Sequence, residues 1–325
     1  MTNKEQYAEW VTTQERLPIF MQPWWLDAVC AGKKWDVLLI RKEEVQIEEA
    51  ETDIVAAQPY LLRERTWAKY ILMPQQTQIG GLYLSEQVAF TAEQLEAVTR
   101  IVATHLQQLG LSYYAQKYPI GSPVPQFLHE HEFKIEEQVT YRIEDLKDLD
   151  KVIDRFSKNK KRQLQKALSL HVANDMTAEQ FYKFHSDCMQ LQRKQISYQR
   201  EFFLVLERKT SRRQQSQILV IRNADGVAYA AAFVVWDKQS MYYLIPCYDP
   251  QYKDSGASAL LVLEAIKLAR EQGVAFDFEG SMVRGVAQHY KQFGSTKTTY
   301  YKIEKYYKWW FHFATFWNWC RGRKY

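Results

Sequence analysis

Two halves of the chain carry the same succession of patterns, and this repeat limits the folds that the chain can adopt. In the first half, DIVAAQPYLLRE (53–64) and GGLYLS (80–85) alternate like strands, and the helical pattern TAEQLEAVTRIVATHLQQLG and the strand LSYYAQ follow. In the second half, VAYAAAFVVW (227–236) and SMYYLIPC (240–247) are followed by SGASALLVLEAIKLAREQG and VAFDFEG. Both helical patterns end at a glycine, Gly110 and Gly273. The repeat predicts a duplicated α/β unit with mixed sheets; two unrelated α/β segments that share this order are the alternative.

The halves meet near HEHEFKIEEQVTYRIEDLKDLD (129–150), where a new alternating strand begins. We predict domains at 1–137 and 138–305 and an aromatic, basic tail at 306–325. No linker rich in Pro, Gly or Ser separates the halves, so we expect them to pack rigidly against each other.

Composition excludes several protein classes. The chain begins without a signal-peptide pattern, and no apolar stretch reaches the roughly 20 residues that span a bilayer. The four cysteines lie far apart, with no spacing typical of metal sites, at Cys30, Cys188, Cys247 and Cys320. We therefore expect reduced thiols, no metal, and a cytoplasmic protein. The net charge of +5 permits an anionic ligand such as a nucleotide, a coenzyme or tRNA.

Five stretches along the chain carry a family resemblance: IFMQPWWLDAVC, MPQQTQIGGLY, FSKNKKRQLQKA, YLIPCYDPQYKDSGASALL and FDFEGSMVRGVAQHYKQFGS. In this order they resemble the FemABX-like branch of the GNAT acyltransferase superfamily, over nearly the whole chain. The resemblance implies two tandem GNAT-like domains, each a mixed, mostly antiparallel sheet flanked by helices. It implies transfer of an acyl or aminoacyl group to an amine by direct attack. The donor is acyl-CoA or aminoacyl-tRNA, no cofactor is tightly bound, and many members act on cell-wall or envelope precursors.

In a GNAT-like sheet, the donor lies where the strands at 240–247 and 275–281 diverge. The helix that follows would point its N-terminus at the donor's phosphates. We expect donor contacts from that loop and from the preceding strand, whose backbone N–H groups at Ile245 to Tyr248 would stabilise an oxyanion. The expected donor contacts are Ile245, Cys247, Tyr248, Lys253, Ser255, Gly256 and Ser258. Lys253 and Ser258 depart from the GNAT coenzyme signature, and an ordinary N-capped helix start, with Ser255 as the cap, is the alternative.

Asp277 and Glu279 lie two residues apart on a predicted strand, so they would share one face, while Phe276 and Phe278 take the other. One of the two acids would take a proton from the attacking amine, and Glu279, nearer the carboxyl end, is the better base. Alternatively, the acids pair with Arg284 or Lys291, or cap the helix near Val283. Tyr290 either protonates the leaving group or packs beside Phe293. We expect His289 to face solvent.

The stretch SKNKKRQLQKA interrupts the apolar seam of a helix predicted from about residue 150. At least one of Lys160, Lys161 and Arg162 should therefore turn toward the body of the protein, where it would meet a substrate phosphate. A solvated basic face is the alternative. Neither this stretch nor a second basic cluster, RKTSRR (208–213), alternates with aromatic residues. We therefore expect no sequence-specific DNA binding, whereas tRNA stays open.

The tail YYKWWFHFATFWNWCRGRKY is dense in aromatic residues and basic at its end. It would either pack on the protein, as a domain or dimer contact, or lie in a membrane interface at the inner face. A second function class follows: a catalytically inactive GNAT-fold binding or assembly module, held at a membrane surface by the tail.

Overall fold

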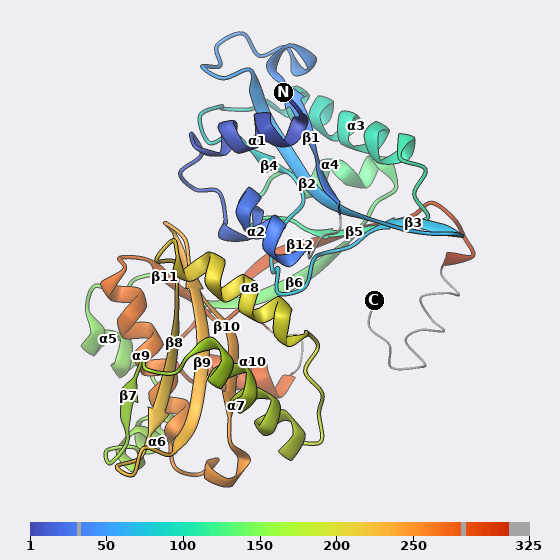
Figure 1. The fold of residues 1–325 in the computed structure, drawn as a ribbon. Helices are drawn as coiled ribbons and strands as arrows, with labels where there is room; N and C mark the ends of the chain where they lie inside the picture. Colours follow the sequence, from blue (N-terminus) through green and yellow to red (C-terminus); the bar gives the residue numbers. More distant parts are fainter. Residues whose placement is uncertain (31–33, 281–283, 312–325) are drawn as a thin grey trace. The chain divides into compact units, whose positions relative to one another are not determined.

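The computed structural model describes residues 1–30, 34–280 and 284–311, without the side chain of Arg284. The chain divides into two compact units (Figure 1). The first contains residues 1–138 and the chain from Thr299 on; the second contains Val139–Thr298. The predicted break at 137/138 lies beside this division, but residues 299–305 differ from the prediction. They belong to the first unit because β12 (Thr296–Tyr306) pairs there with β5 (Tyr113–Lys117).

The first unit is built on a mixed sheet with the order β1-β2-β3-β5-β12. Its strands include β1 (Trp35–Arg41), β2 (Ile54–Arg65) and β3 (Ala68–Ile71); β4 (Tyr83–Leu84) pairs with β2. β3 and β5 run parallel, and the other pairs described in this sheet are antiparallel. The predicted strand at 80–85 forms only the two residues of β4. The parallel neighbour of β5 is β3, a strand that was not predicted.

Helices cover this sheet through apolar stripes. The helix α3 (Ala92–Gln108) begins with a capping box between Thr91 and Gln94, and its buried stripe includes Leu95, Val98, Val102 and Leu106. The other α-helices described in this unit are α1 (Asn3–Val11), α2 (Pro23–Val29) and α4 (Pro125–Leu128). Of the predicted tail, Phe311 is buried against Tyr70 and Tyr113, so the tail begins as packing on the first unit. Residues 312–325 lie outside the described part.

The second unit has the sheet order β6-β11-β10-β9-β8-β7. The strands are β6 (Lys134–Ile143), which begins in the first unit, β7 (His171–Ala173), β8 (Ser216–Arg222), β9 (Ala228–Trp236), β10 (Ser240–Tyr248) and β11 (Ala275–Asp277). β10 and β11 are parallel, whereas the remaining pairs are antiparallel. Each unit is therefore a mixed, mostly antiparallel sheet with one parallel pair among its described strands, as the fold prediction requires.

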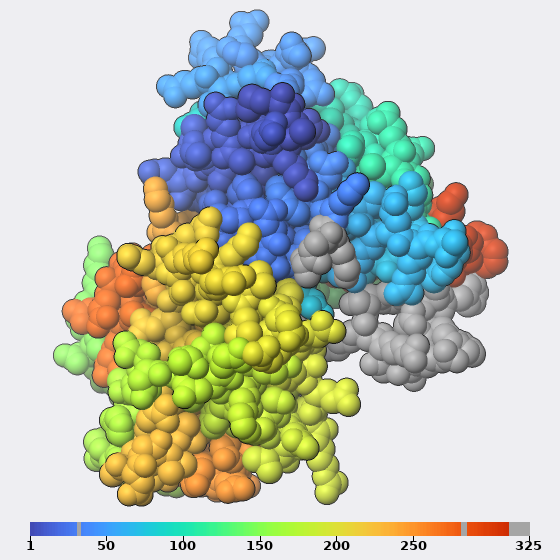
Figure 2. Space-filling model, viewed as in Figure 1, coloured from blue at the N-terminus to red at the C-terminus, as the bar shows by residue number. Residues whose placement is uncertain are grey.

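Helices lie on both faces of this second sheet, which explains why β9 is apolar at almost every position. On one face, Ala230, Ala232 and Val234 pack in a cluster with the buried stripe of α9 (Ala257–Glu271). On the other, Phe233 contacts Phe181 and Phe203, from α7 (Ala178–Leu191) and α8 (Arg200–Ser211). Figure 2 shows α7 and α8, in yellow-green and yellow, covering the second face.

The helix predicted from about residue 150 is two helices, α5 (Leu149–Asp154) and α6 (Lys158–Lys166). Ser157 separates them because its hydroxyl caps α6 by accepting the N–H of Lys160. The last helix of the unit is α10 (Arg284–Lys291). Among the described helices, none combines the length and the apolar character needed to cross a bilayer.

Candidate functional site

The parallel strands β10 and β11 stay paired over only three residues of each. The pairs run from Ser240 with Ala275 to Tyr242 with Asp277, where β11 ends. β10 continues to Tyr248, and its register against β9 shifts between Tyr242 and Ile245. From Tyr243 on, one edge of β10 therefore has no strand beside it in the described part of the chain.

A cavity of about 340 Å³ lies at this unpaired end of β10. Its walls come from β10, from the first turns of α9 and from α10, and they include Cys247, Tyr248, Ser258, His289 and Tyr290. Of the donor contacts expected from the sequence, Cys247, Tyr248 and Ser258 line the cavity. Ile245, Lys253, Ser255 and Gly256 do not.

The β10 backbone offers this cavity fewer N–H groups than the sequence analysis expected. The N–H of Asp249 donates to the carbonyl of Tyr229 on β9, at 2.9 Å. Because N–H directions alternate in an antiparallel ladder, Ile245 and Cys247 also point their N–H groups toward β9. Pro246 has none. The N–H of Tyr248 alone, from the predicted set Ile245–Tyr248, points away from β9.

Gly256 has a structural reason to be glycine that differs from the predicted one. It is the N-cap of α9, in place of Ser255, and has a left-handed φ of +86°. A Cβ added there would lie 2.1 Å from the backbone oxygen of Gln163 on α6. The absence of a side chain at Gly256 therefore lets α6 pack closely against this turn. Ser255 turns inward too: its hydroxyl accepts the N–H of Ala257 at 3.2 Å and donates to the carbonyl of Tyr252 at 2.6 Å.

Asp277 is fully buried and its oxygens are engaged. It accepts hydrogen bonds from the hydroxyl of Thr140, from Arg142 Nη1 at 3.0 Å, and from the N–H of Glu279 at 2.7 Å. Burial raises the pKa of Asp277, opposed by Arg142 and Thr140. This geometry assigns Asp277 to holding β11 against β6, so the prediction of a catalytic Asp277 is not supported. Its partner is Arg142, and the predicted partner Lys291 does not take this place.

Glu279 does not share a strand face with Asp277, because β11 ends at Asp277 and Glu279 has a φ of +62°. Its side chain is not part of the cavity wall. It acts on the site through its charge, which contributes to the raised pKa of Tyr290. The predicted contact Arg284 opens α10, but its side chain lies outside the described residues, as do residues 281–283.

Tyr290 lines the cavity and also packs in the core. Its ring stacks on Phe278 with centroids 4.5 Å apart, a different neighbour from the predicted Phe293. Burial, assisted by the negative charges of Glu279 and Asp277, raises the pKa of Tyr290 to about 12. The phenol therefore keeps its proton at neutral pH and is able to donate it.

Lys160, which is buried, and His289, which is half-buried and lines the cavity, form a pair. Lys160 is 2% exposed, and its Nζ lies 3.1 Å from His289 Nδ1 and 3.0 Å from Gln163 Oε1. Burial lowers the pKa of Lys160 to about 8. Burial and the charge of Lys160 lower the pKa of His289 to about 4. The imidazole is therefore neutral at pH 7.

The pair confirms that one residue of the basic stretch turns toward the body of the protein. The other two stay near the surface, where Lys161 binds Asp154 and Arg162 binds Asn159. The expectation of a solvent-facing His289 is wrong. A sequence signal was present: His289 lies four residues before Phe293, and such residues share one face of a helix.

Comparisons with known proteins agree with this geometry. Residues 132–292 match the family described as Acetyltransferase (GNAT) domain. No curated protein sequence matches the chain. The solved structure of FemX has a TM-score of 0.68 and 11% identity, over 93% of this chain and 96% of that chain. A conserved protein of unknown function from Bacteroides thetaiotaomicron has a TM-score of 0.61 and 10% identity, over 93% and 96%.

A tandem GNAT protein from the clavulanic acid biosynthesis pathway has a TM-score of 0.53 and 10% identity, over 93% of this chain and 94% of that chain. At such identities these likenesses show the fold. The described residues hold no group of three or more His, Cys, Asp or Glu side chains that is able to bind a metal ion. Together, these comparisons show that residues 132–292 match a GNAT domain family and that the chain has the fold of FemX and of a tandem GNAT protein.

Proposed function

We propose that the chain is an N-acyltransferase and that the acyl group reacts in the cavity between β10, α9 and α10. The observation that carries this proposal is the separation of β10 from β11. It leaves one strand edge and a cavity of about 340 Å³ beside ionisable side chains. A cavity of this size accepts an acyl or aminoacyl group together with the end of its carrier.

The N–H of Tyr248 is the proposed oxyanion donor. It is the group within 245–248 that the strand alternation turns away from β9. When an amine attacks the donor carbonyl, negative charge develops on the carbonyl oxygen, and a fixed N–H in a site with little water stabilises it. No covalent enzyme intermediate is needed for direct attack by an amine.

The Lys160–His289 pair is the proposed proton acceptor. His289 Nε2 forms no hydrogen bond with the described residues, whereas Nδ1 faces Lys160 Nζ at 3.1 Å. With Lys160 neutral, Nδ1 carries the imidazole proton and Nε2 has a free electron pair. The amine then gives its proton to Nε2 while the Nδ1 proton passes to Lys160. The proton rests on an amine with a pKa of about 8, so transfer should become faster as pH rises through about 8.

Tyr290 is the proposed acid for the leaving group. A phenol with a pKa of about 12 is a poor acid toward a thiolate, because thiols have a pKa of about 8.5. It is better matched to an alkoxide, which is far more basic. We therefore propose an oxygen ester such as aminoacyl-tRNA as the donor, in preference to acyl-CoA.

The acceptor is an amine, and a cell-envelope precursor is the class that the family resemblance suggests. Lys161 and Arg162 do not belong to the Lys160–His289 pair, and we propose that they contact a substrate phosphate. Because Lys160 is buried behind His289, we assign it to proton transfer and not to contact with a substrate phosphate.

Single-turnover transfer from charged tRNA and from acetyl-CoA to a simple amine tests the proposal. We expect transfer from the tRNA ester, and a loss of about 100-fold or more in His289→Gln. His171→Gln, an exposed histidine of the same unit, should have no effect. Faster transfer from acetyl-CoA would reverse the proposed donor, and full activity of His289→Gln would refute the proton path. No transfer from either donor would favour the inactive binding module.

A further inference from the structure

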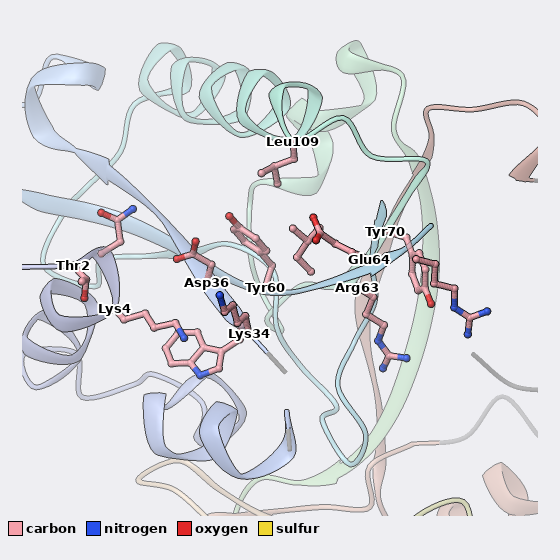
Figure 3. A pocket seen from close by; sticks show the side chains of 13 residues that line it. Thr2, Lys4, Lys34, Asp36, Tyr60, Arg63, Glu64, Tyr70 and Leu109 are labelled. Carbon is pink, nitrogen blue, oxygen red and sulfur yellow. The ribbon is translucent and has the colours of Figure 1, made fainter. Parts of the chain in front are cut away.

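A second hollow, of about 900 Å³, lies entirely in the first unit (Figure 3). It surrounds the point where β1 begins beside β2. Its walls come from the start of α1, from residues 34–36, from the second half of β2, and from Tyr70 and Leu109. The proposed acyl-transfer site uses none of these residues.

Strand alternation sorts the charges of this hollow onto two faces of the sheet. Trp35 lies opposite Leu61, and Arg63 lies opposite Tyr70, so these four residues and Arg65 share one face. Asp36 lies opposite Tyr60, and Glu64 lies opposite Lys69, on the other face. In Figure 3, Arg63 and Glu64 accordingly point to opposite sides of β2. The two arginines therefore lie on one face of the sheet, and the two carboxylates lie on the other.

Both carboxylates already have a partner, whereas the two arginines and Lys34 have no acidic partner among the described residues. Glu64 pairs with Lys69 at 3.1 Å, and Asp36 accepts the N–H of Val37 at 2.8 Å. Arg63 Nε is a buried donor without a hydrogen-bond partner among the described residues. Lys34, Arg63 and Arg65 form no ion pair in the described part of the chain, and Lys4 Nζ lies 4.4 Å from the centroid of the Trp35 ring.

A buried guanidinium donor without an acceptor is costly unless a ligand completes it. The β1–β2 register also ends at Leu61, so from Leu62 on β2 has no strand on that edge in the described residues. The hollow thus offers the guanidinium of Arg63, and Lys4, Lys34 and Arg65 also line it. A planar guanidinium binds an oxyanion through two oxygens side by side.

We propose that this hollow binds the phosphate group of a ligand, with Arg63 as its central contact and Lys4, Lys34 and Arg65 as flanking charges. The phosphate belongs either to a small soluble molecule or to a lipid headgroup. The lipid source is consistent with Trp67, which is 50% exposed at the turn that follows Arg65. A carboxylate ligand is also negatively charged, but it has fewer oxygen atoms than a phosphate with which to contact four cations.

The experiment titrates the full chain with pyrophosphate at low salt by calorimetry. We expect binding that Arg63→Gln weakens at least tenfold. Lys69→Gln, on the opposite face of the same hairpin, should leave binding unchanged. Lys34→Gln, at an exposed position, serves as the second test variant, and a thermal melt shows whether Arg63→Gln is still folded.

Vesicles distinguish the two phosphate sources. The ligand is a lipid headgroup if the protein sediments with phosphatidylglycerol vesicles but not with phosphatidylcholine vesicles, and if Arg63→Gln abolishes that sedimentation. Pyrophosphate binding without sedimentation identifies a soluble ligand. Absence of binding to both probes, or equal weakening by Arg63→Gln and Lys69→Gln, overturns the proposal, since the second result means general surface charge.

Discussion

Replacing Lys160 by methionine tests the Lys160–His289 pair directly. Burial and the charge of Lys160 together lower the pKa of His289 from 6.5 to about 4, and burial is the larger cause. The charge therefore accounts for less than half of the difference. Methionine removes the charge and keeps the site dry, so the pKa of His289 should rise by about 1, to about 5, equivalent to about 1.4 kcal/mol.

The ring nitrogens of His289, followed by ¹⁵N NMR against pH, provide the assay. In the unaltered chain they should also report a change of tautomer near pH 8, when Lys160 loses its proton and Nδ1 becomes the donor. Lys160→Met should abolish that change. Lys161→Met, at the neighbouring position, should retain both the low pKa and the tautomer change.

The same substitution changes how stability depends on pH. His289 takes up a proton near pH 6.5 in the unfolded chain but only near pH 4 in the folded chain. This histidine therefore makes the folded state less stable as pH falls from 6.5 to 4. In Lys160→Met the loss of folding stability that His289 causes should end near pH 5. An unchanged pKa of His289, or the same rise in Lys161→Met, would refute the reasoning.

Three further predictions concern stability. Gly256→Ala should cost about 2–4 kcal/mol, because its Cβ would strike a backbone carbonyl of α6; Gly226→Ala, with a similar φ and open space, should cost about 1 kcal/mol in urea unfolding. Asp277→Asn should cost about 3 kcal/mol, since it leaves a buried guanidinium half paired, while Glu144→Gln on the exposed side of the same arginine should cost less than about 1 kcal/mol. Burial would raise the pKa of Glu304, but hydrogen bonds from two lysines and a tyrosine lower it to about 2. The unaltered chain should therefore lose stability as pH falls from 4.5 to 2, and thermal melts should find this loss absent in Glu304→Gln.

Local patterns predicted the features that depend on local physics. The duplicated order of elements and the glycine ends of the two long helices are present, with Gly110 and Gly273 at φ of +65° and +71°. The gap in the apolar seam correctly indicated a buried cation, which is Lys160. Each of these follows from periodicity or from a conformation that glycine favours.

What the sequence did not predict depends on register between distant strands. Asp277 meets Arg142 because β11 lies beside β6, from 135 residues earlier in the chain. Glu279 leaves the predicted strand face because β11 stops one residue after Phe276. The role of Gly256 required knowledge of α6, whose carbonyl of Gln163 comes from another helix. The residue pattern of a single segment does not indicate which distant segment will pack beside it.

β12 has a consequence for how the protein is made. It covers the edge of β5, and its Glu304 accepts hydrogen bonds from Tyr113 and Lys134, yet it is synthesised after the whole second unit. On the ribosome, the first 138 residues therefore emerge with one strand missing and an open sheet edge. The contiguous segment 139–298 is complete in the nascent chain before the first unit receives its final strand. Synthesis that stops before residue 299 would leave one edge of β5 unpaired, the kind of edge that chaperones protect and that promotes aggregation.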